Sequence, residues 1–280
     1  MKKGVIRRKP FEPKSGEADH DSRDGGVQSV DRALSIIETL AEDDEGYRLS
    51  DLAVHTGLSA STVHRLLATL ESRRFVQFDR AESKWHVGVR SFTVGASFAR
   101  RRNFSAQAIP YLRKLRDLTR ETANLAVVDD EYVIVLTRME SREIMRSLTQ
   151  VGGRVAMVTS GVGKAVLATY SDEDVAAVIR HHGMPRLTEK SIVRPSDLFR
   201  ELEKIRKQGY ALDDEEACMG LRCIAAVVYN DCAEPLAAIS ISGMTSRLTD
   251  DRLPEVGQMV RDVAGELTVA LGGAMPVSRI

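Results

Sequence analysis

Four side chains in one short stretch could form hydrogen bonds with nucleic-acid bases: Ser61, Thr62, His64 and Arg65. Hydroxyl, imidazole and guanidinium groups suit base edges and phosphate oxygens. The apolar residues between and after them fall at helical spacing, namely Val63, Leu66, Leu67 and Leu70. This pattern predicts an amphipathic helix whose exposed face carries the polar groups.

The elements that must position this helix form a helix-turn-helix pattern. Ser50 is predicted to cap a first short helix that turns Leu52 and Ala53 inward. Gly57 occupies the tight turn, where a left-handed backbone is needed. Ser59 is predicted to cap the second helix. The alternative is an ordinary helical hairpin inside a core, because such motifs also occur by chance.

The flanking segments favour a winged helix. Ser29 is predicted to cap a preceding helix, which the acidic loop Glu42–Gly46 ends. Two β-rich runs, Phe75–Phe78 and Trp85–Val87, surround a polar turn and predict a hairpin, or wing. Arg32 and Lys84 are expected to steady the DNA backbone or an adjacent groove, on a face away from the acidic loop.

Composition sets broad limits. The chain has 280 residues, with 40 basic and 40 acidic side chains, so global charge does not indicate nucleic-acid binding. No apolar run approaches the roughly 20 residues that span a bilayer, and no signal peptide is apparent. Three cysteines without a paired CxxC spacing favour neither a disulfide framework nor a zinc site. A cytoplasmic protein with no membrane partner is predicted.

The sequence predicts two domains with tails. Residues 1–26 read as a disordered basic tail, either trailing over phosphates or simply solvated. A winged helix-turn-helix domain is expected at 27–89, a linker helix at 90–104, an effector-binding domain at 105–273 and a C-terminal tail at 274–280. The linker region ends in the basic run Arg100–Arg102, which suits either phosphate contact or a solvated helix end.

The large domain is predicted to be α+β. Leu125–Val128 pairs with Tyr132–Leu136, and Cys223–Tyr229 pairs with Leu236–Ser242, as antiparallel hairpins. An amphipathic helix with Pro110 near its start precedes them, with Tyr111, Leu112, Leu115 and Leu118 facing inward. Further helices are predicted at 163–170, 172–181, 197–209 and 250–272. Antiparallel pairs interrupted by helices are typical of an α+β sheet.

The chemistry of the large domain points away from an enzyme. The segment 160–165 resembles a phosphate loop, but Val158 and Ala165 replace the required glycine and hydroxyl residues. What remains is a Gly-rich turn that opens a helix, suited to a small anion or merely to helix geometry. The acidic run Asp213–Glu216 is expected to be solvated, and His181 with His182 to be a helix end. Cys223 could be a nucleophile, but a buried structural thiol is commoner. We predict no catalytic residue, metal site or cofactor.

The chain from Val27 to Gly273 resembles the IclR family of bacterial transcriptional regulators. The resemblance is carried by five segments in the family's order: VQSVDRALSIIETLAE, LSDLAVHTGLSASTVHRLLATLESRRFV, SGVGKAVLA, RKQGYALDDEEACMGLRCIAA and AAISISGMTSRLTDDRL. The last two segments look most like the branch of glyoxylate-bypass repressors. The resemblance implies a winged-helix domain, a linker helix and a GAF-like domain that binds a small effector. It also implies homodimers, often homotetramers, on palindromic double-stranded operator DNA.

The resemblance also implies an effector site. Its residues, carried over by motif, are Ile144, Ser147, Gly161, Val162, Asp213, Leu221, Cys223, Ser240 and Ser242. Ser240 and Ser242 are two apart on a strand and so share a face. Two positions depart from the pattern. Val158 stands where close relatives often have histidine, and Ser147 stands where the glyoxylate-bypass repressors have a bulkier apolar residue. Glyoxylate or pyruvate is therefore not assumed as the effector.

Two functional hypotheses follow. The first is a ligand-responsive DNA-binding regulator, expected to be a repressor. Its DNA contacts would come from Arg32, Ser59, Ser61, Thr62, His64, Arg65 and Lys84, and its effector would be a small organic carboxylate or carbonyl compound. The alternative is a metabolite-binding or hydrolytic domain in which the helix-turn-helix serves only for dimerisation.

Overall fold

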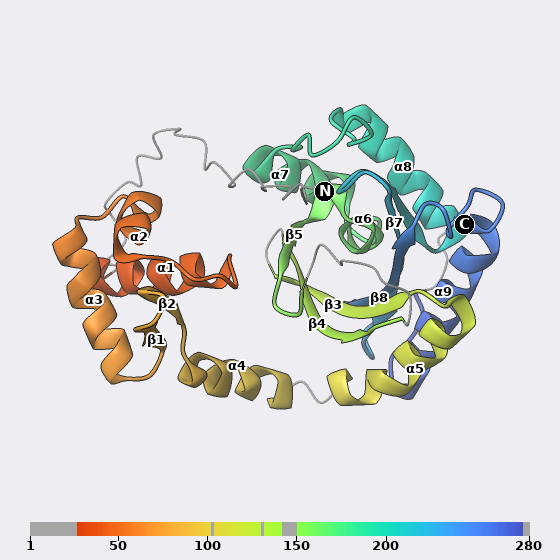
Figure 1. Cartoon of the computed structure of the whole chain (residues 1–280). Helices are drawn as coiled ribbons and strands as arrows, with labels where there is room; N and C mark the ends of the chain where they lie inside the picture. The colour runs from red at the N-terminus through yellow and green to blue at the C-terminus, as the bar shows by residue number, and fades with distance from the viewer. Residues whose placement is uncertain (1–26, 102–103, 130–131, 142–149, 277–280) are drawn as a thin grey trace, which may run out of the picture. The chain divides into compact units, whose positions relative to one another are not determined.

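The computed structural model describes residues 27–101, 104–129, 132–141 and 150–276 (Figure 1). They form two compact units whose boundary falls between Ala96 and Ser97. The predicted basic tail, the effector-site residues Ile144 and Ser147, and the final residues 277–280 lie outside the described residues. Among the described helices, none is long and apolar enough to cross a membrane.

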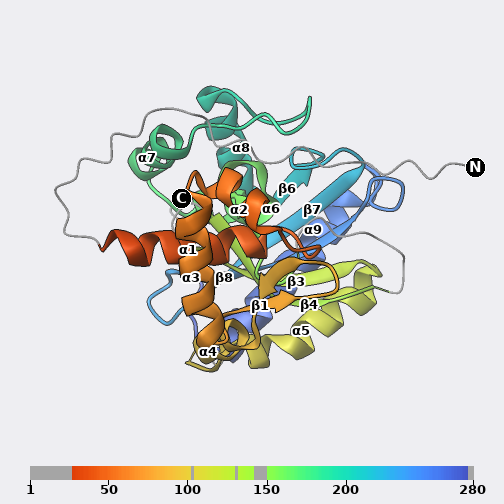
Figure 2. The same ribbon diagram turned by 60° about the vertical axis from the view of Figure 1, so that its left-hand side comes forward.

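The first unit is a winged helix-turn-helix, which Figure 2 brings forward. Its elements are α1 (Gln28–Ala41), α2 (Leu49–Thr56), α3 (Ala60–Ser72), β1 (Val76–Asp79) and β2 (Lys84–Val87). Apolar residues from all five elements make one core: Ile36, Leu40, Leu52, Val63, Leu67, Val76 and Trp85. The strands β1 and β2 pair antiparallel as the predicted wing, and Tyr47 adds an isolated bridge to Trp85.

The turn and caps of the helix-turn-helix follow local chemistry, with two corrections. Gly57 adopts a φ of 65° at the end of α2, and the Ser59 hydroxyl accepts the Thr62 N–H at 3.3 Å, as predicted. The predicted caps Ser29 and Ser50 are wrong, because each lies inside its helix. The carbonyls of Val27 and Arg48 accept the first helical N–H groups instead, so both helices begin before their serines.

The chain leaves α3 through a locked turn. Arg74 has a φ of 64°, and the N–H groups of Arg74 and Phe75 donate to the carbonyls of Glu71 and Leu70. The next helix, α4 (Val89–Arg101), starts against this turn. The Arg90 N–H donates to the Arg74 carbonyl at 3.0 Å, and the Ser91 hydroxyl donates to the Phe75 carbonyl at 2.9 Å. The start of α4 is therefore fixed to the end of α3.

The second unit is α+β, as predicted. Its strands are β3 (Thr122–Asp129), β4 (Tyr132–Met139), β5 (Arg154–Ala156), β6 (Ala211–Asp214), β7 (Leu221–Tyr229) and β8 (Pro235–Met244). Its helices are α5 (Phe104–Thr119), α6 (Gly161–Leu167), α7 (Asp172–His182), α8 (Pro195–Gln208) and α9 (Leu253–Ala270), with a short 3-10 turn η1 (Met157–Thr159). The strands form one antiparallel sheet in the order β5-β4-β3-β8-β7-β6, which confirms both predicted hairpins.

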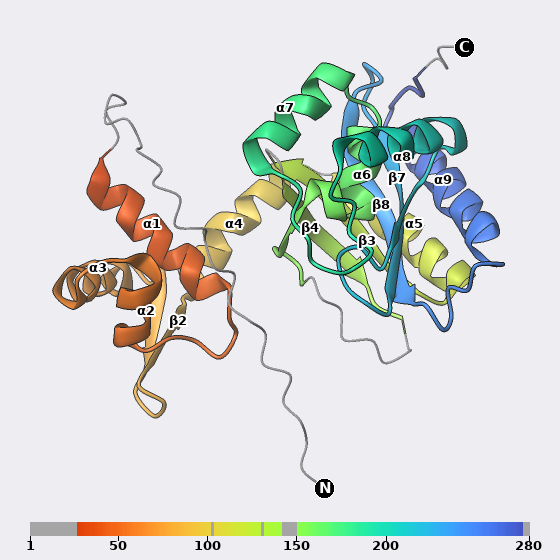
Figure 3. The ribbon, with the colours of Figure 1, turned by 90° about the horizontal axis from the view of Figure 1, so that it is seen from above.

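Helices cover both faces of this sheet (Figure 3). On one face α5 and α9 pack against alternate strand residues such as Leu125, Ile224 and Ile239. On the other face α6 packs against the intervening residues, such as Ala225 and Ala238, and α8 covers α6. Strand side chains alternate between the α5–α9 face and the α6 face, except where the register shifts at Leu125/Ala126 and Val228/Tyr229.

The helix before the sheet differs from its prediction. Since α5 begins at Phe104, Pro110 lies inside the helix rather than near its start. Leu118, predicted to face inward, is 50% exposed because the last turn of α5 leaves that side uncovered. The helices predicted from residues 163 and 197 begin two residues earlier, and that predicted from 250 begins three residues later.

Candidate nucleic-acid interface and effector site

The outer face of α3 presents the predicted polar groups. Ser59, Ser61, His64 and Arg65 are exposed, whereas Thr62 is half-buried. The Ser59 hydroxyl lies 2.8 Å from the Thr62 hydroxyl and 3.1 Å from that of Ser61. Ser59 thus organises the first turn of α3, while His64 and Arg65 project from its middle.

The two flanking cations are placed differently from each other. Arg32 is half-buried on α1. Lys84 opens β2 and turns toward the acidic loop, where it donates to the Glu45 carbonyl at 2.9 Å and lies 3.7 Å from the Glu45 carboxylate. The structure therefore links Lys84 to the loop that the DNA face was expected to avoid, and its DNA contact stays a prediction.

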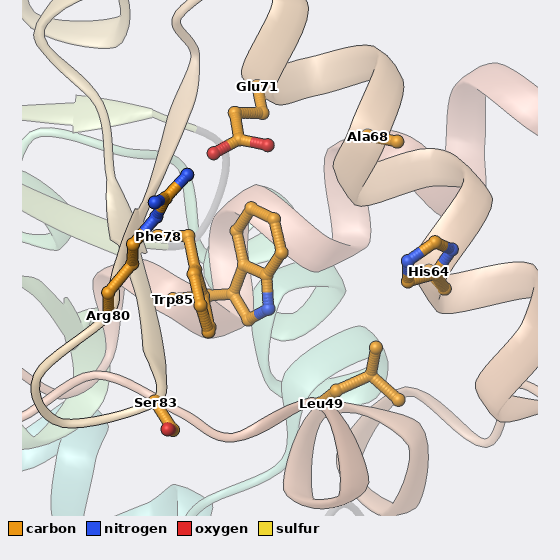
Figure 4. Close-up of a pocket in the computed structure, with 8 residues that line it drawn as sticks. All are labelled: Leu49, His64, Ala68, Glu71, Phe78, Arg80, Ser83 and Trp85. Atoms are coloured by element: carbon orange, nitrogen blue, oxygen red, sulfur yellow. The ribbon is translucent and has the colours of Figure 1, made fainter.

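A groove separates α3 from the wing (Figure 4). It encloses about 500 Å³ and is lined by Leu49, His64, Ala68, Glu71, Phe78, Arg80, Ser83 and Trp85. Phe78 packs on Trp85 with ring centroids 4.9 Å apart, and Arg80 reaches toward Glu71 across the groove (Figure 4). Arg80 is a wing cation that sequence reasoning missed, although its place in a polar hairpin turn could have indicated it.

The predicted effector residues that the structure describes meet on the α6 face of the sheet. The strand register aligns Thr122, Ser242, Cys223 and Asp213 in one row across β3, β8, β7 and β6. The adjacent row aligns Arg138, Asn124 and Ser240 across β4, β3 and β8. Because residues paired across neighbouring strands point to the same face, two neighbouring rows of polar groups lie beneath α6.

The hydroxyl groups in these rows are loosely held. The Asn124 amide lies 3.5 Å from the Ser240 hydroxyl and 3.4 Å from the Ser242 hydroxyl, both long for hydrogen bonds. The Arg138 guanidinium donates to the side-chain oxygen Oδ1 of Asn124 at 3.2 Å. The serine hydroxyls also hydrogen-bond the Cys223 thiol, which is a weak partner, so they are able to turn toward a ligand.

Two glycines bring α6 onto these rows. A methyl group on Gly161 would lie 2.9 Å from the Cys223 carbonyl and 3.2 Å from its sulfur, and one on Gly163 would lie 2.1 Å from the Met157 carbonyl. The Gly-rich turn is thus required by close packing of α6 on β7 and η1. Val162 is buried in the same core, while Leu221 is half-buried at the start of β7.

The acidic run Asp213–Glu216 was predicted to be solvated, and this prediction is wrong for two of its residues. Asp213 and Glu216 are only 6% and 5% exposed, because strand alternation turns Asp213 under α6 while Asp214 faces the opposite side. Asp214 binds Lys190 and Arg222 there. Lys164 of α6 is fully buried and forms an ion pair with Glu216.

Cys223 lacks the chemistry of a nucleophile. Burial raises the pKa of the Cys223 thiol to about 11, and Asp213 raises it further, although the Ser240 and Ser242 hydroxyls act in the opposite direction. At neutral pH the thiol is therefore protonated and unreactive. Within the described residues, no three His, Cys, Asp or Glu side chains gather in a way that could hold a metal ion.

Sequence reasoning missed Asn124, Arg138, Lys164 and Glu216. Asn124 interrupts an otherwise apolar strand, which is a signal that could have been read. Lys164 lies between Val162, Ala165, Val166 and Leu167 on a helix that is apolar on every side, which likewise indicates burial.

A winged helix-turn-helix with an exposed polar recognition helix, joined to an α+β domain with a polar sheet face, defines a DNA-binding transcriptional regulator. Two family models match the chain, one over the winged helix-turn-helix and one over the α+β domain. The model of the IclR helix-turn-helix domain matches residues 29–80, and that of the bacterial transcriptional regulator IclR C-terminal domain matches residues 96–269. The chain belongs to the IclR family.

Known proteins agree with this membership. The acetate operon repressor of Salmonella typhimurium is 42% identical over 251 residues, which cover 89% of this chain and 92% of that protein. The transcriptional repressor IclR of Escherichia coli is 42% identical with the same coverage. The crystal structure of an IclR homologue complexed with 4-hydroxybenzoate, from Microbacterium hydrocarbonoxydans, has a TM-score of 0.75 at 21% identity, covering 87% of this chain and 98% of that one. The first two names confirm that the chain is a regulator and not an enzyme.

Proposed function

We propose that this protein is a repressor that binds a palindromic operator and changes its DNA affinity when a small organic effector occupies the α6 face of the sheet. Dimers, or tetramers built from dimers, would place two α3 helices in successive turns of the major groove. Repression is favoured because the relatives at 42% identity are named repressors. Exposure of Ser61, His64 and Arg65 on α3 supports direct contact with base edges.

The observation that carries the effector proposal is the pair of polar rows under α6. Buried strand residues are normally apolar, and polar groups left there with long mutual hydrogen bonds favour a ligand that completes them. Ser240, Ser242 and the Asn124 amide offer donors and acceptors suited to a carboxylate or carbonyl oxygen. The complex of a homologous structure with 4-hydroxybenzoate supports a small carboxylate as the class of effector.

Regulation would follow from differential binding. An effector shifts a protein between two states only by the difference between its affinities for them. Occupation of the α6 face would therefore favour one arrangement of the dimer, and through it a higher or lower affinity for the operator.

A DNA titration tests the proposal. Fluorescence anisotropy with labelled DNA from upstream of the protein's own gene should show saturable binding that weakens as salt concentration rises. Addition of individual small carboxylates should shift the midpoint for at least one compound. Arg65→Ala should weaken this binding. Arg200→Ala, at an exposed position on α8 of the other unit, is its matched control. Folded protein that binds none of these fragments at low salt would refute the proposal.

A further inference from the structure

Two carboxylates and one ammonium group lie together at the Asp213 end of the polar row. The buried Lys164 Nζ pairs with Glu216 Oε1 and donates to the Leu212 carbonyl at 2.6 Å. Asp213 Oδ1 accepts the backbone N–H groups of Glu216 at 2.8 Å and Ala217 at 3.3 Å. If both carboxylates were ionised, this enclosed cluster would carry a net charge of −1.

The second carboxylate oxygen of Glu216 receives no compensation for its burial. Oε2 is buried and has no hydrogen-bond partner within the described part of the chain. An ionised oxygen in that position would lose its hydration without compensation. One proton taken up by either carboxyl group removes the excess negative charge of the cluster, because two nearby carboxylates disfavour each other's ionisation.

The segment between α7 and α8 seals the cluster from one side. The Ser191 hydroxyl donates to the Glu216 carbonyl at 2.8 Å, and the Thr188 hydroxyl donates to the Glu215 carbonyl at 2.7 Å. Lys190 of this segment binds Glu215 and Asp214 on the outside. Because Lys190 pairs with these two carboxylates, it does not neutralise Asp213.

Among the residues that the structure describes, the remaining ionisable neighbours do not supply a second positive charge. Glu201 of α8 adds a negative field at Glu216, and the Cys218 thiol of the β6–β7 connection feels the Asp213 charge. The Cys223 thiol of β7 stays protonated. Arg222 of β7 points to the opposite face, where it binds Asp214 and Asp250. Arg138 lies on β4, four strands from Asp213 in the sheet order.

We propose that Asp213 and Glu216 together hold one proton at neutral pH, and that a carboxylate effector binds beside Asp213 only while this proton is present. The inference rests on the proposed function, which places the effector against Cys223, Ser240 and Ser242. Ser242 and Cys223 lie between Thr122 and Asp213 in one row, with strands spaced about 4.8 Å apart. An anion that contacts Cys223 would thus be one strand from Asp213, and its contact with Ser242 would be two strands away.

The pKa shifts have the direction that this proposal requires. Burial raises the pKa of Asp213 to about 7, opposed by the Lys164 charge and reinforced by Glu216. Burial also raises the pKa of Glu216, again opposed by Lys164. A bound anion raises these values further, because a neighbouring negative charge disfavours ionisation. Effector binding above pH 7 must therefore take up a proton.

The sign of the pH dependence follows from this linkage. Below about pH 7 the proton is already present, and carboxylate affinity should be nearly constant. Above pH 7 each bound carboxylate must recruit one proton, so affinity should fall by up to about tenfold per pH unit. A neutral ligand of the same shape should show neither effect.

Calorimetric titration of the full-length protein tests the proposal, with pyruvate and 4-hydroxybenzoate as probes and pyruvamide as the neutral comparison. Titrations at pH 8 in buffers of different ionisation enthalpy count the protons taken up. We expect close to one proton for a carboxylate and none for pyruvamide. Asp213→Asn, which mimics the protonated carboxyl, should bind the carboxylate more tightly than the wild type at pH 8.5 and lose the pH dependence.

Asp214→Asn is the matched control, because the adjacent carboxyl faces the opposite side of the sheet and should leave proton uptake unchanged. Infrared spectroscopy at pH 7 without any ligand should show a protonated-carboxyl band that Asp213→Asn alters. Absence of the band, or carboxylate binding without proton uptake, overturns this inference and leaves the proposed regulator intact. A band without binding of any carboxylate would instead refute the carboxylate class of effector and the binding half of the inference.

Discussion

The polar residues of α3 and those of the α6 sheet face serve recognition under opposite conditions. On α3, His64 and Arg65 extend from an exposed helix face over a separate apolar core. On the sheet, Ser240, Asp213 and Lys164 lie inside the packed interior, where each must be matched by a partner. Exposed groups such as His64 and Arg65 can therefore be changed on α3 without disturbing the fold, whereas a change to Asp213 or Lys164 affects recognition and stability together.

Removal of the buried cation should have the largest effect. Lys164→Met leaves the carboxylates of Asp213 and Glu216 without their countercharge and should lower the free energy of unfolding by about 3–5 kcal/mol. Urea denaturation followed by circular dichroism measures the change. Lys204→Met, at an exposed ion pair with Glu201, should have little effect. A loss no greater than that of the control would show that the interior does not depend on this charge.

Truncation of Arg65 should separate DNA binding from folding. Arg65→Ala should weaken operator binding by about 1–3 kcal/mol, because a guanidinium contact with a base or phosphate is lost. Anisotropy titration measures the affinity, while the free energy of unfolding should change by less than about 0.5 kcal/mol. If stability fell as much as affinity did, the contrast between the two regions would not hold.

The N-cap residue of α3, Ser59, is a polar side chain of the first unit that also contributes to stability. Ser59→Ala removes the acceptor of the Thr62 N–H and should destabilise the protein by about 1 kcal/mol. Ser50→Ala is the matched control, since Ser50 lies inside α2 and caps no N–H group there. Thermal denaturation of both variants tests this prediction, and equal losses would contradict the assignment of the cap.

Ser240→Ala should give the smallest effect. Its hydroxyl makes a long contact of 3.5 Å with Asn124, so its loss should hardly change stability. Effector affinity should fall by roughly 0.5–1.5 kcal/mol, which corresponds to a few-fold increase in Kd. Calorimetric titration measures it, with DNA affinity in the absence of effector as the unchanged reference. Unaltered effector binding would place the ligand elsewhere on the sheet.

Local patterns explain why the first unit was predictable. Val63 and Leu67 repeat at helical spacing, Gly57 and Ser59 mark the turn and the cap, and the wing is a hairpin between neighbouring segments. These signals act over a few residues and need no tertiary contact. The Ser29 and Ser50 caps were wrong because a backbone carbonyl two residues earlier, that of Val27 or Arg48, accepts the first helical N–H group.

The sheet face was predictable only in part. Strand alternation correctly placed Ser240 and Ser242 together, and the family resemblance named Cys223 and Asp213 beside them. Asn124 and Lys164 escaped notice, because their environment comes from segments more than 40 residues distant. A run of acidic residues is ordinarily solvated, and only the assembled sheet shows that Asp213 is not.

The joint between α3 and α4 has a mechanical consequence. The locked turn at Arg74 ends α3, and the same residue, with Phe75, receives the first turn of α4. These hydrogen bonds couple the first turn of α4 to the end of α3. A rotation of the first turn of α4 would therefore also move the end of α3, because hydrogen bonds rather than a loose loop join them.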